Sequence, residues 1–89
     1  MRAILTVLGS DKIGIIAGVS DLLAKSNINI LDISQTTMQE IFTMIMLVDT
    51  SSMTVSFTEL AKLLDKKGEE LGVTISIQRE DIFNSMHRI

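Results

Sequence analysis

Two segments of this chain are apolar at nearly every position. They are residues 3–8 (AILTVL) and residues 41–49 (IFTMIMLVD). Successive side chains of a β-strand point to opposite faces of the sheet, so a strand that is apolar on both faces needs cover on both sides. Because a chain of 89 residues builds only one small domain, we expect these segments to be the two central strands of a single sheet.

The stretch between residues 9 and 27 has the pattern of a turn followed by an amphipathic helix. Gly9 and Ser10 end the first strand, and Asp11 is a good N-cap for a helix whose apolar residues recur every three or four positions. Gly18 lies inside this predicted helix, where we expect its missing side chain to allow close packing of the helix on the sheet.

A second amphipathic helix is predicted for residues 56–72. Ser56 or Thr58 can cap its N-terminus, and leucines recur along one stripe of it. We expect Gly68 to interrupt or loosen this helix and Gly72 to end it, because glycine destabilises helix interiors and favours the C-terminal cap.

Residues 28–38 and residues 73–78 are predicted to be the other two strands. Both have polar side chains on one face, which is typical of strands at a sheet edge, and Gln39 with Glu40 forms a tight turn. The resulting order of elements is βαββαβ. With right-handed crossovers, this order predicts an α+β, ferredoxin-like sandwich, in which a four-stranded antiparallel sheet (order 4-1-3-2) carries both helices on one face.

Such a fold leaves the second apolar face of the central strands without cover from the helices. We expect residues 1–80 to form the domain and residues 81–89 to form a short helical tail, packed on the domain or on a partner. The apolar residues of the tail recur at helical spacing, namely Ile82, Phe83, Met86 and Ile89. Either this tail or the second subunit of a homodimer is expected to cover the second face.

The composition narrows the classes of function. The absence of cysteine removes disulfides, zinc–thiolate sites and thiol catalysis. A net charge of −3 counts against a nucleic-acid partner, because phosphate binding relies on clustered Lys and Arg. The apolar runs are too short for a membrane span, and the first residues do not have the pattern of a secretory signal. We therefore expect a cytoplasmic protein without a membrane or nucleic-acid partner.

Residues that could carry catalysis or bind a metal are scattered. His87 is the single histidine and lacks a neighbouring partner for base catalysis or metal binding. The carboxylates of Asp11, Asp21, Asp32 and Asp49 fall on different elements without metal-loop spacing. The sequence therefore predicts no catalytic residues, no metal and no cofactor, and hence a protein that is not an enzyme.

The loop GSDKIG, residues 9–14, is the one stretch that favours a ligand. Free backbone N–H groups and the positive end of a helix dipole at such a loop suit a carboxylate or another anion. The loop lacks the Gly-Lys-Ser/Thr ending of a phosphate loop and the complete spacing of a dinucleotide loop. Asp11 can equally act as a helix cap alone, so capping and ligand binding both remain open.

The segment DKIGIIAGVSDLLAKSNINILDISQ resembles the ACT domain. That family begins its first helix with an Asp-x-x-Gly-hydrophobic-hydrophobic-Ala pattern, here starting at Asp11 and Gly14, and enters its second strand with an Asn-Ile pair, here Asn29 and Ile30. The βαββαβ order extends the resemblance over nearly the whole chain. Together with the tail, it is similar to the small stand-alone UPF0237 proteins, and to the ACT regions of the glycine-cleavage regulator and of formyltetrahydrofolate deformylase.

The resemblance implies where a ligand would lie. Amino-acid-binding ACT domains hold their ligand at a subunit interface, between the first loop and the start of the second strand. By position, this implies a site formed by Gly9, Ser10, Asp11, Ile13, Gly14, Ile15 and Asn29. This chain has Ile13 where the family commonly has proline, and Asp11 where such binders often have a neutral amide, a change that favours an ammonium group.

Four functions follow from these observations. The first is a regulatory, non-catalytic module that binds a small molecule, an amino acid by resemblance, and acts as a homodimer on a regulated protein that the sequence does not identify. The second is an assembly module without a ligand. The third is an RNA-binding domain of the same fold, which would need stacking aromatics where the strands offer Phe42 alone. The fourth is a small acylphosphatase-like enzyme, which would need an Arg in the first loop.

Overall fold

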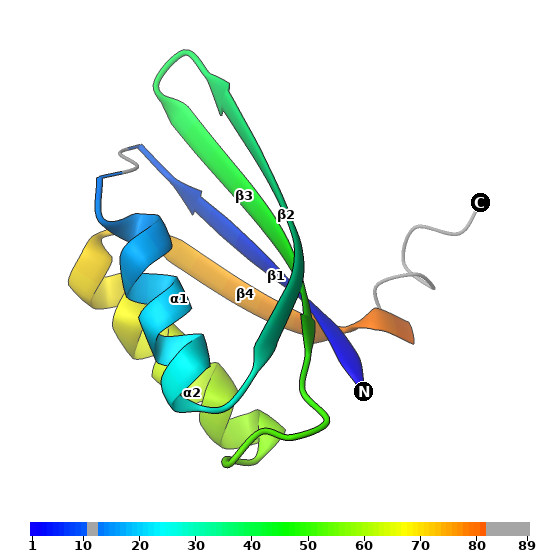
Figure 1. Cartoon of the computed structure of the whole chain (residues 1–89). Helices are drawn as coiled ribbons and strands as arrows, with labels where there is room; N and C mark the ends of the chain where they lie inside the picture. Colours follow the sequence, from blue (N-terminus) through cyan, green and yellow to red (C-terminus); the bar gives the residue numbers. More distant parts are fainter. Residues whose placement is uncertain (11–12, 82–89) are drawn as a thin grey trace.

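The computed structural model describes residues 1–10 and 13–81. Six elements follow one another in the chain, and they are β1 (Arg2–Gly9), α1 (Ile15–Lys25), β2 (Asn29–Met38), β3 (Ile41–Asp49), α2 (Phe57–Leu71) and β4 (Thr74–Arg79). The strands form one antiparallel sheet in the order β2-β3-β1-β4, and both helices lie on the same face of it (Figure 1). The predicted ferredoxin-like fold and strand order are confirmed.

The core lies between the helices and one face of the two central strands. Alternate residues of these strands point into it and are almost completely buried: Ala3, Leu5 and Val7 from β1, and Phe42, Met44, Met46 and Val48 from β3. The helices contribute Ile15, Val19, Leu23, Leu60 and Leu64. Burial of this continuous apolar layer is the main favourable contribution to folding.

The first helix begins later than predicted. Its N-cap is Gly14, with φ of 77°, so the expectation that Asp11 caps the helix is wrong. A left-handed φ suits glycine, which has no Cβ to clash with the backbone. The first helical hydrogen bond runs from the amide N–H of Gly18 to the carbonyl of Gly14, at 2.9 Å. Asp11 itself lies outside the described residues.

Two predictions about glycines inside the helices are also wrong. Gly18 packs against the other helix and not against the sheet, because a Cβ there would lie 3.0 Å from Cδ1 of Leu71. α2 continues through Gly68 without interruption. A Cβ at Gly68 would come within 2.7 Å of the carbonyl oxygen of Val73, so this glycine allows the end of α2 to approach β4.

The predicted ends of the second helix are confirmed. Ser56 is its N-cap, and the Ser56 hydroxyl accepts a hydrogen bond of 3.1 Å from the backbone N–H of Glu59. Gly72 is its C-cap, with φ of 73°. Both caps satisfy backbone groups that the helix itself leaves without partners.

The β2–β3 hairpin extends beyond the helices (Figure 1). As predicted, β2 is an edge strand, and nearly all of its residues are exposed. Gln39 adopts φ of 55° in the predicted turn, and the β2 ladder shifts register between Ile30 and Asp32. The predicted tail falls on residues 82–89, which lie outside the described residues, so its helical form stays a prediction.

Candidate functional site

The sheet face opposite the helices is uncovered in the described part of the chain. We call it the open face. On the central strands its side chains are Ile4, Thr6 and Leu8 of β1 and Ile41, Thr43, Ile45 and Leu47 of β3, which alternate with the core residues. The flanking strands add mostly polar side chains, namely Asp32, Ser34, Thr36 and Met38 of β2 and Thr74, Ser76 and Gln78 of β4.

Several large apolar side chains of the open face are exposed. The exposed fraction is 48% for Leu8, 55% for Ile41, 41% for Ile45 and 67% for Met38. A contiguous apolar surface with a polar rim is the usual composition of a protein interface. The second apolar face that the sequence predicted therefore exists, and within the described residues nothing covers it.

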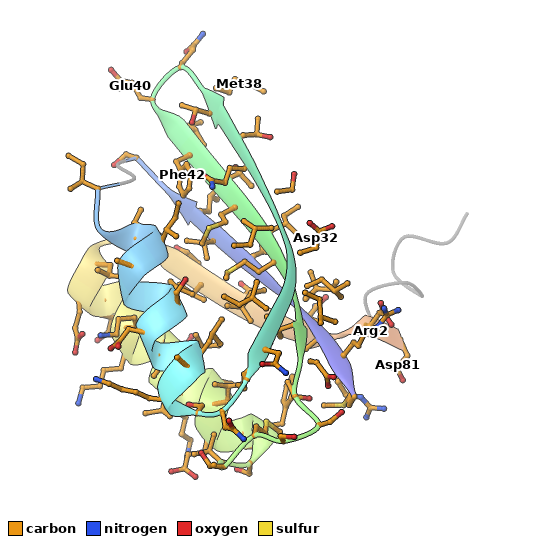
Figure 2. The ribbon with its side chains drawn as sticks, viewed as in Figure 1. Arg2, Asp32, Met38, Glu40, Phe42 and Asp81 are labelled. Atoms are coloured by element: carbon orange, nitrogen blue, oxygen red, sulfur yellow. The ribbon has the colours of Figure 1, made fainter. Side chains whose placement is uncertain are left out.

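Charged side chains gather at one end of the open face. There the guanidinium of Arg2 pairs with the carboxylate of Glu80, 2.7 Å away, and Asp49 lies opposite Arg2 in the ladder. Figure 2 shows Arg2 at this end, and Met38 with Glu40 at the tip of the β2–β3 hairpin at the other end. The hairpin end, which includes Leu8 and Ile41, is the more apolar one.

Five of the predicted site residues come together at the hairpin end. Gly9 and Ser10 end β1, and Gly14 with Ile15 begins α1 beside it; Ile13 is largely exposed between them. Ile15 is buried, so its side chain belongs to the core and only its backbone can face a ligand. This arrangement places the N-terminus of α1 next to the end of the central strand.

Asn29 lies at the opposite end of the sheet. It pairs with Asp49 on β3, whereas Gly9 pairs with Phe42 on the same strand. Seven strand residues separate these two positions, which corresponds to about 24 Å at ~3.4 Å per residue. A single chain therefore does not bring Asn29 to the first loop, and a shared site needs Asn29 from a second subunit.

A groove of about 510 Å³ lies beside the first loop. Its apolar lining comes from Leu8, Ile41 and Val73. Its other lining residues are the glycines Gly9, Gly68 and Gly72 and the polar residues Ser10, Glu69 and Thr74. The groove thus lies where β1 ends, β4 begins and α2 ends, which are close together in Figure 1.

The α2 side of this groove was not predicted from the sequence. Gly68 and Gly72, four residues apart, were the available signal, but a glycine inside a predicted helix indicates weak helix as readily as close approach. In the sequence, Glu69 is one of several charged residues of the second predicted helix, and no pattern sets it apart from the others. Only the fold shows that these residues meet the end of β1.

The described residues show little that suits catalysis. Within residues 1–10 and 13–81, no three His, Cys, Asp or Glu side chains lie together as metal ligands would. Asp49 has a lowered pKa because the hydroxyl and the backbone N–H of Ser51 both donate hydrogen bonds to its carboxylate, at 2.6 and 2.9 Å. Asp49 is at the charged end of the sheet, far from the groove.

The open face also lacks a stacking platform for bases. Phe42 is 2% exposed and points into the core between sheet and helices. RNA-binding modules of this fold stack bases on aromatic side chains of the sheet surface, and the strands offer no other aromatic residue. None of the helices in the described part is long and apolar enough to cross a membrane.

Comparison with known proteins decides the family. Residues 2–78 match the family model of the ACT domain. A UPF0237 protein of Clostridium acetobutylicum is 64% identical over 89 residues, which covers 100% of both chains. This chain belongs to the ACT domain family, among its UPF0237 proteins.

Solved structures agree with this assignment. The ACT domain protein from Streptococcus pneumoniae has a TM-score of 0.83 and 47% identity to this ACT domain, over 93% of each chain. A formyltetrahydrofolate deformylase from Pseudomonas syringae shares the fold, with a TM-score of 0.78 at 23% identity, over 88% of this chain and 27% of the enzyme. The resemblance expected from residues 11–35 is therefore confirmed for both the family and the fold.

Proposed function

We propose that this ACT domain is a non-catalytic regulatory module that binds a small molecule, an amino acid, and acts as a homodimer. The observation that carries the proposal is the open face. Its centre is apolar and uncharged, and it borders a groove and the first loop at the hairpin end. A surface of this kind supports a binding role. Among the described lining residues of the groove, the side chains with polar or charged groups are Ser10, Glu69 and Thr74.

The size of the open face supports a second copy as its cover. Four strands about 4.8 Å apart and about eight residues long span roughly 500 Å² in each copy, so two copies would bury about 1,000 Å². That area reaches the lower limit for a specific interface. Apolar side chains in the centre and polar strands at the rim match the anatomy of such interfaces.

The proposed ligand site is the one implied at the first loop. It consists of Gly9, Ser10, Asp11, Ile13, Gly14 and Ile15, with Asn29 supplied by the partner subunit. The backbone N–H groups at the start of α1 would hold the carboxylate of the ligand. The amide of Asn29 can both donate and accept hydrogen bonds, which suits a zwitterion. Ligand binding would then favour one dimer arrangement, which a regulated protein reads.

The test is a thermal-stability scan against the common amino acids, on protein whose oligomeric state is fixed by light scattering. A ligand at about 100 times its Kd should add roughly 2.7 kcal/mol of stability, which shifts the Tm of a small domain by several degrees. We expect a shift with one amino acid that is lost in Asp11→Ala or Asn29→Ala. If no amino acid shifts the Tm of a well-folded dimer, the proposal that the domain binds an amino acid is wrong.

The open face equally favours an assembly module without a ligand, as the second candidate. Such a module would use the apolar face for protein contacts alone. It predicts a stable dimer whose Tm no amino acid changes, so the same scan separates the two candidates.

A further inference from the structure

The groove at the end of α2 has an apolar floor that three segments build together. Leu8, Ile41 and Val73 line it, and Gly9 and Gly68 both pack against Val73. Side chains at these two glycines would collide with Val73 and separate the segments. Its volume of about 510 Å³ lies within the roughly 300–1,000 Å³ of known small-molecule sites.

The described lining residues of this groove carry a negative charge. Among the lining residues that the structure describes, Glu69 is the charged one, and no Lys or Arg of the described part of the chain forms a salt bridge with it. The groove also contains the C-terminal end of α2, a helix of 15 residues with no basic residue in its last turn. The end of such a helix carries about half a negative charge on its free carbonyl groups.

These two features favour a small cation with an apolar body. A divalent metal ion would need several carboxylates, and the described lining of the groove offers one. A primary ammonium group has three N–H donors, and three side chains of the described lining can accept from them, namely the carboxylate of Glu69 and the hydroxyls of Ser10 and Thr74. The apolar floor would then contact the carbon skeleton of the ligand.

We propose that this groove binds the ammonium end of a small amine, with Glu69 as its counter-ion. The inference rests on the proposed function in so far as that amine is the amino group of the regulatory ligand. The ammonium group would then lie on the α2 side of the first loop. Glu69 and Thr74, which would bind it there, are not among the residues that the family resemblance implies. Leu8, Ile41 and Thr74 belong to both the groove and the open face, so a second copy on that face would close the groove over its ligand.

The experiment compares three ligand sets by isothermal titration and thermal shift. The sets are the common amino acids, the amines that correspond to them without the carboxylate, and their N-acetyl derivatives without the ammonium charge. We expect the amino acid that binds to lose at least tenfold in affinity on N-acetylation, because a charge-assisted contact is removed.

Glu69→Gln and Glu70→Gln are the matched variants. Glu70 is the next residue of the same helix, and its carboxylate pairs with the ammonium of Lys67, 3.0 Å away. Glu69→Gln should weaken binding about tenfold, whereas Glu70→Gln should leave it unchanged. Both changes are on an exposed helix surface, so both proteins should fold.

The outcomes separate this inference from the proposed function. If an amino acid binds but Glu69→Gln behaves like Glu70→Gln, or the N-acetyl derivative binds equally well, the groove assignment is wrong and the proposed function stands. If simple amines bind in a Glu69-dependent way and no amino acid does, the groove stands and the amino-acid ligand is wrong. If no compound of the three sets binds, both are wrong.

Discussion

The two faces of the sheet are built from the same two strands and have opposite environments. On β1, Leu5 is completely buried under the helices, whereas Leu8, three residues further on, is 48% exposed on the open face. Both faces are apolar in the sequence, so hydrophobicity alone does not tell which face the chain covers itself. The difference shows that when a chain has more apolar residues than its single core can bury, the remaining ones indicate a binding surface.

The largest expected difference between the faces is in folding stability. Leu5→Ala should lower the free energy of unfolding by about 3 kcal/mol, because it leaves a cavity in a packed core. Leu8→Ala should cost about 1 kcal/mol or less in dilute protein, where no second copy covers it. Urea denaturation at low and high protein concentration measures both. Equal costs in dilute protein would show that the faces do not differ in this way.

Dimerisation should be more sensitive to substitutions on the open face than to substitutions on the helices. Ile45→Glu places a charge at its centre and should weaken the dimer at least 30-fold, about 2 kcal/mol, because the carboxylate would be buried without a partner. Thr58→Glu adds the same charge in the exposed first turn of α2 and is the control. Sedimentation velocity over a concentration series gives both Kd values. If Ile45→Glu leaves the Kd of the dimer unchanged, the interface does not lie on the open face.

The covered face depends on the close approach of α2 to β4. Gly68→Ala should destabilise the fold by about 1–2 kcal/mol, because the new methyl group would collide with the carbonyl of Val73. Helix propensity by itself would give the opposite sign, a gain of about 1 kcal/mol. Lys66→Ala, at an exposed position of the same helix, controls for propensity. Thermal unfolding measures which of the two effects is larger. A Gly68→Ala variant with a higher Tm would contradict the close approach of α2 to β4.

The smallest effect concerns the charged end of the sheet. The pKa of Asp49 is lowered from 3.8 by the hydrogen bonds from Ser51. A depressed pKa means that the folded state favours the carboxylate, so its contribution to stability is present above pH 3.8 and is lost as the pH falls through the lowered pKa. Carbon-13 NMR titration should give a higher pKa for Asp49 in Ser51→Ala. An unchanged pKa would exclude the Ser51 hydroxyl as a cause of the lowered pKa.

Much of the fold could be predicted from the sequence. Apolar residues on both faces placed β1 and β3 in the centre of the sheet, and the cap residues Ser56 and Gly72 set the ends of α2. The start of α1 was wrong because Asp11 and Gly14 both suit a helix start, and only the observed left-handed φ of Gly14 decides between them. The physical reason is that the capping propensity of a residue does not determine the backbone conformation of the loop that precedes the helix.

The candidate site was less predictable. Gly9 and Ser10 could be singled out because they follow a strand and precede a helix. Glu69 and Thr74 could not, because they reach the groove only when α2 and β4 pack against the end of β1, which no local pattern encodes. The distance of Asn29 from the first loop is likewise a property of strand register.

The measurement that tests the account most directly is an isotope-filtered NMR experiment on a mixed dimer. One subunit carries labelled isoleucine and leucine methyl groups, and only contacts between subunits are recorded. The account predicts contacts from Leu8, Ile41 and Ile45 of the open face to protons of the unlabelled subunit. Contacts from the exposed surfaces of the helices alone, or a protein that stays monomeric at NMR concentrations, would contradict the claim that a second copy covers the open face.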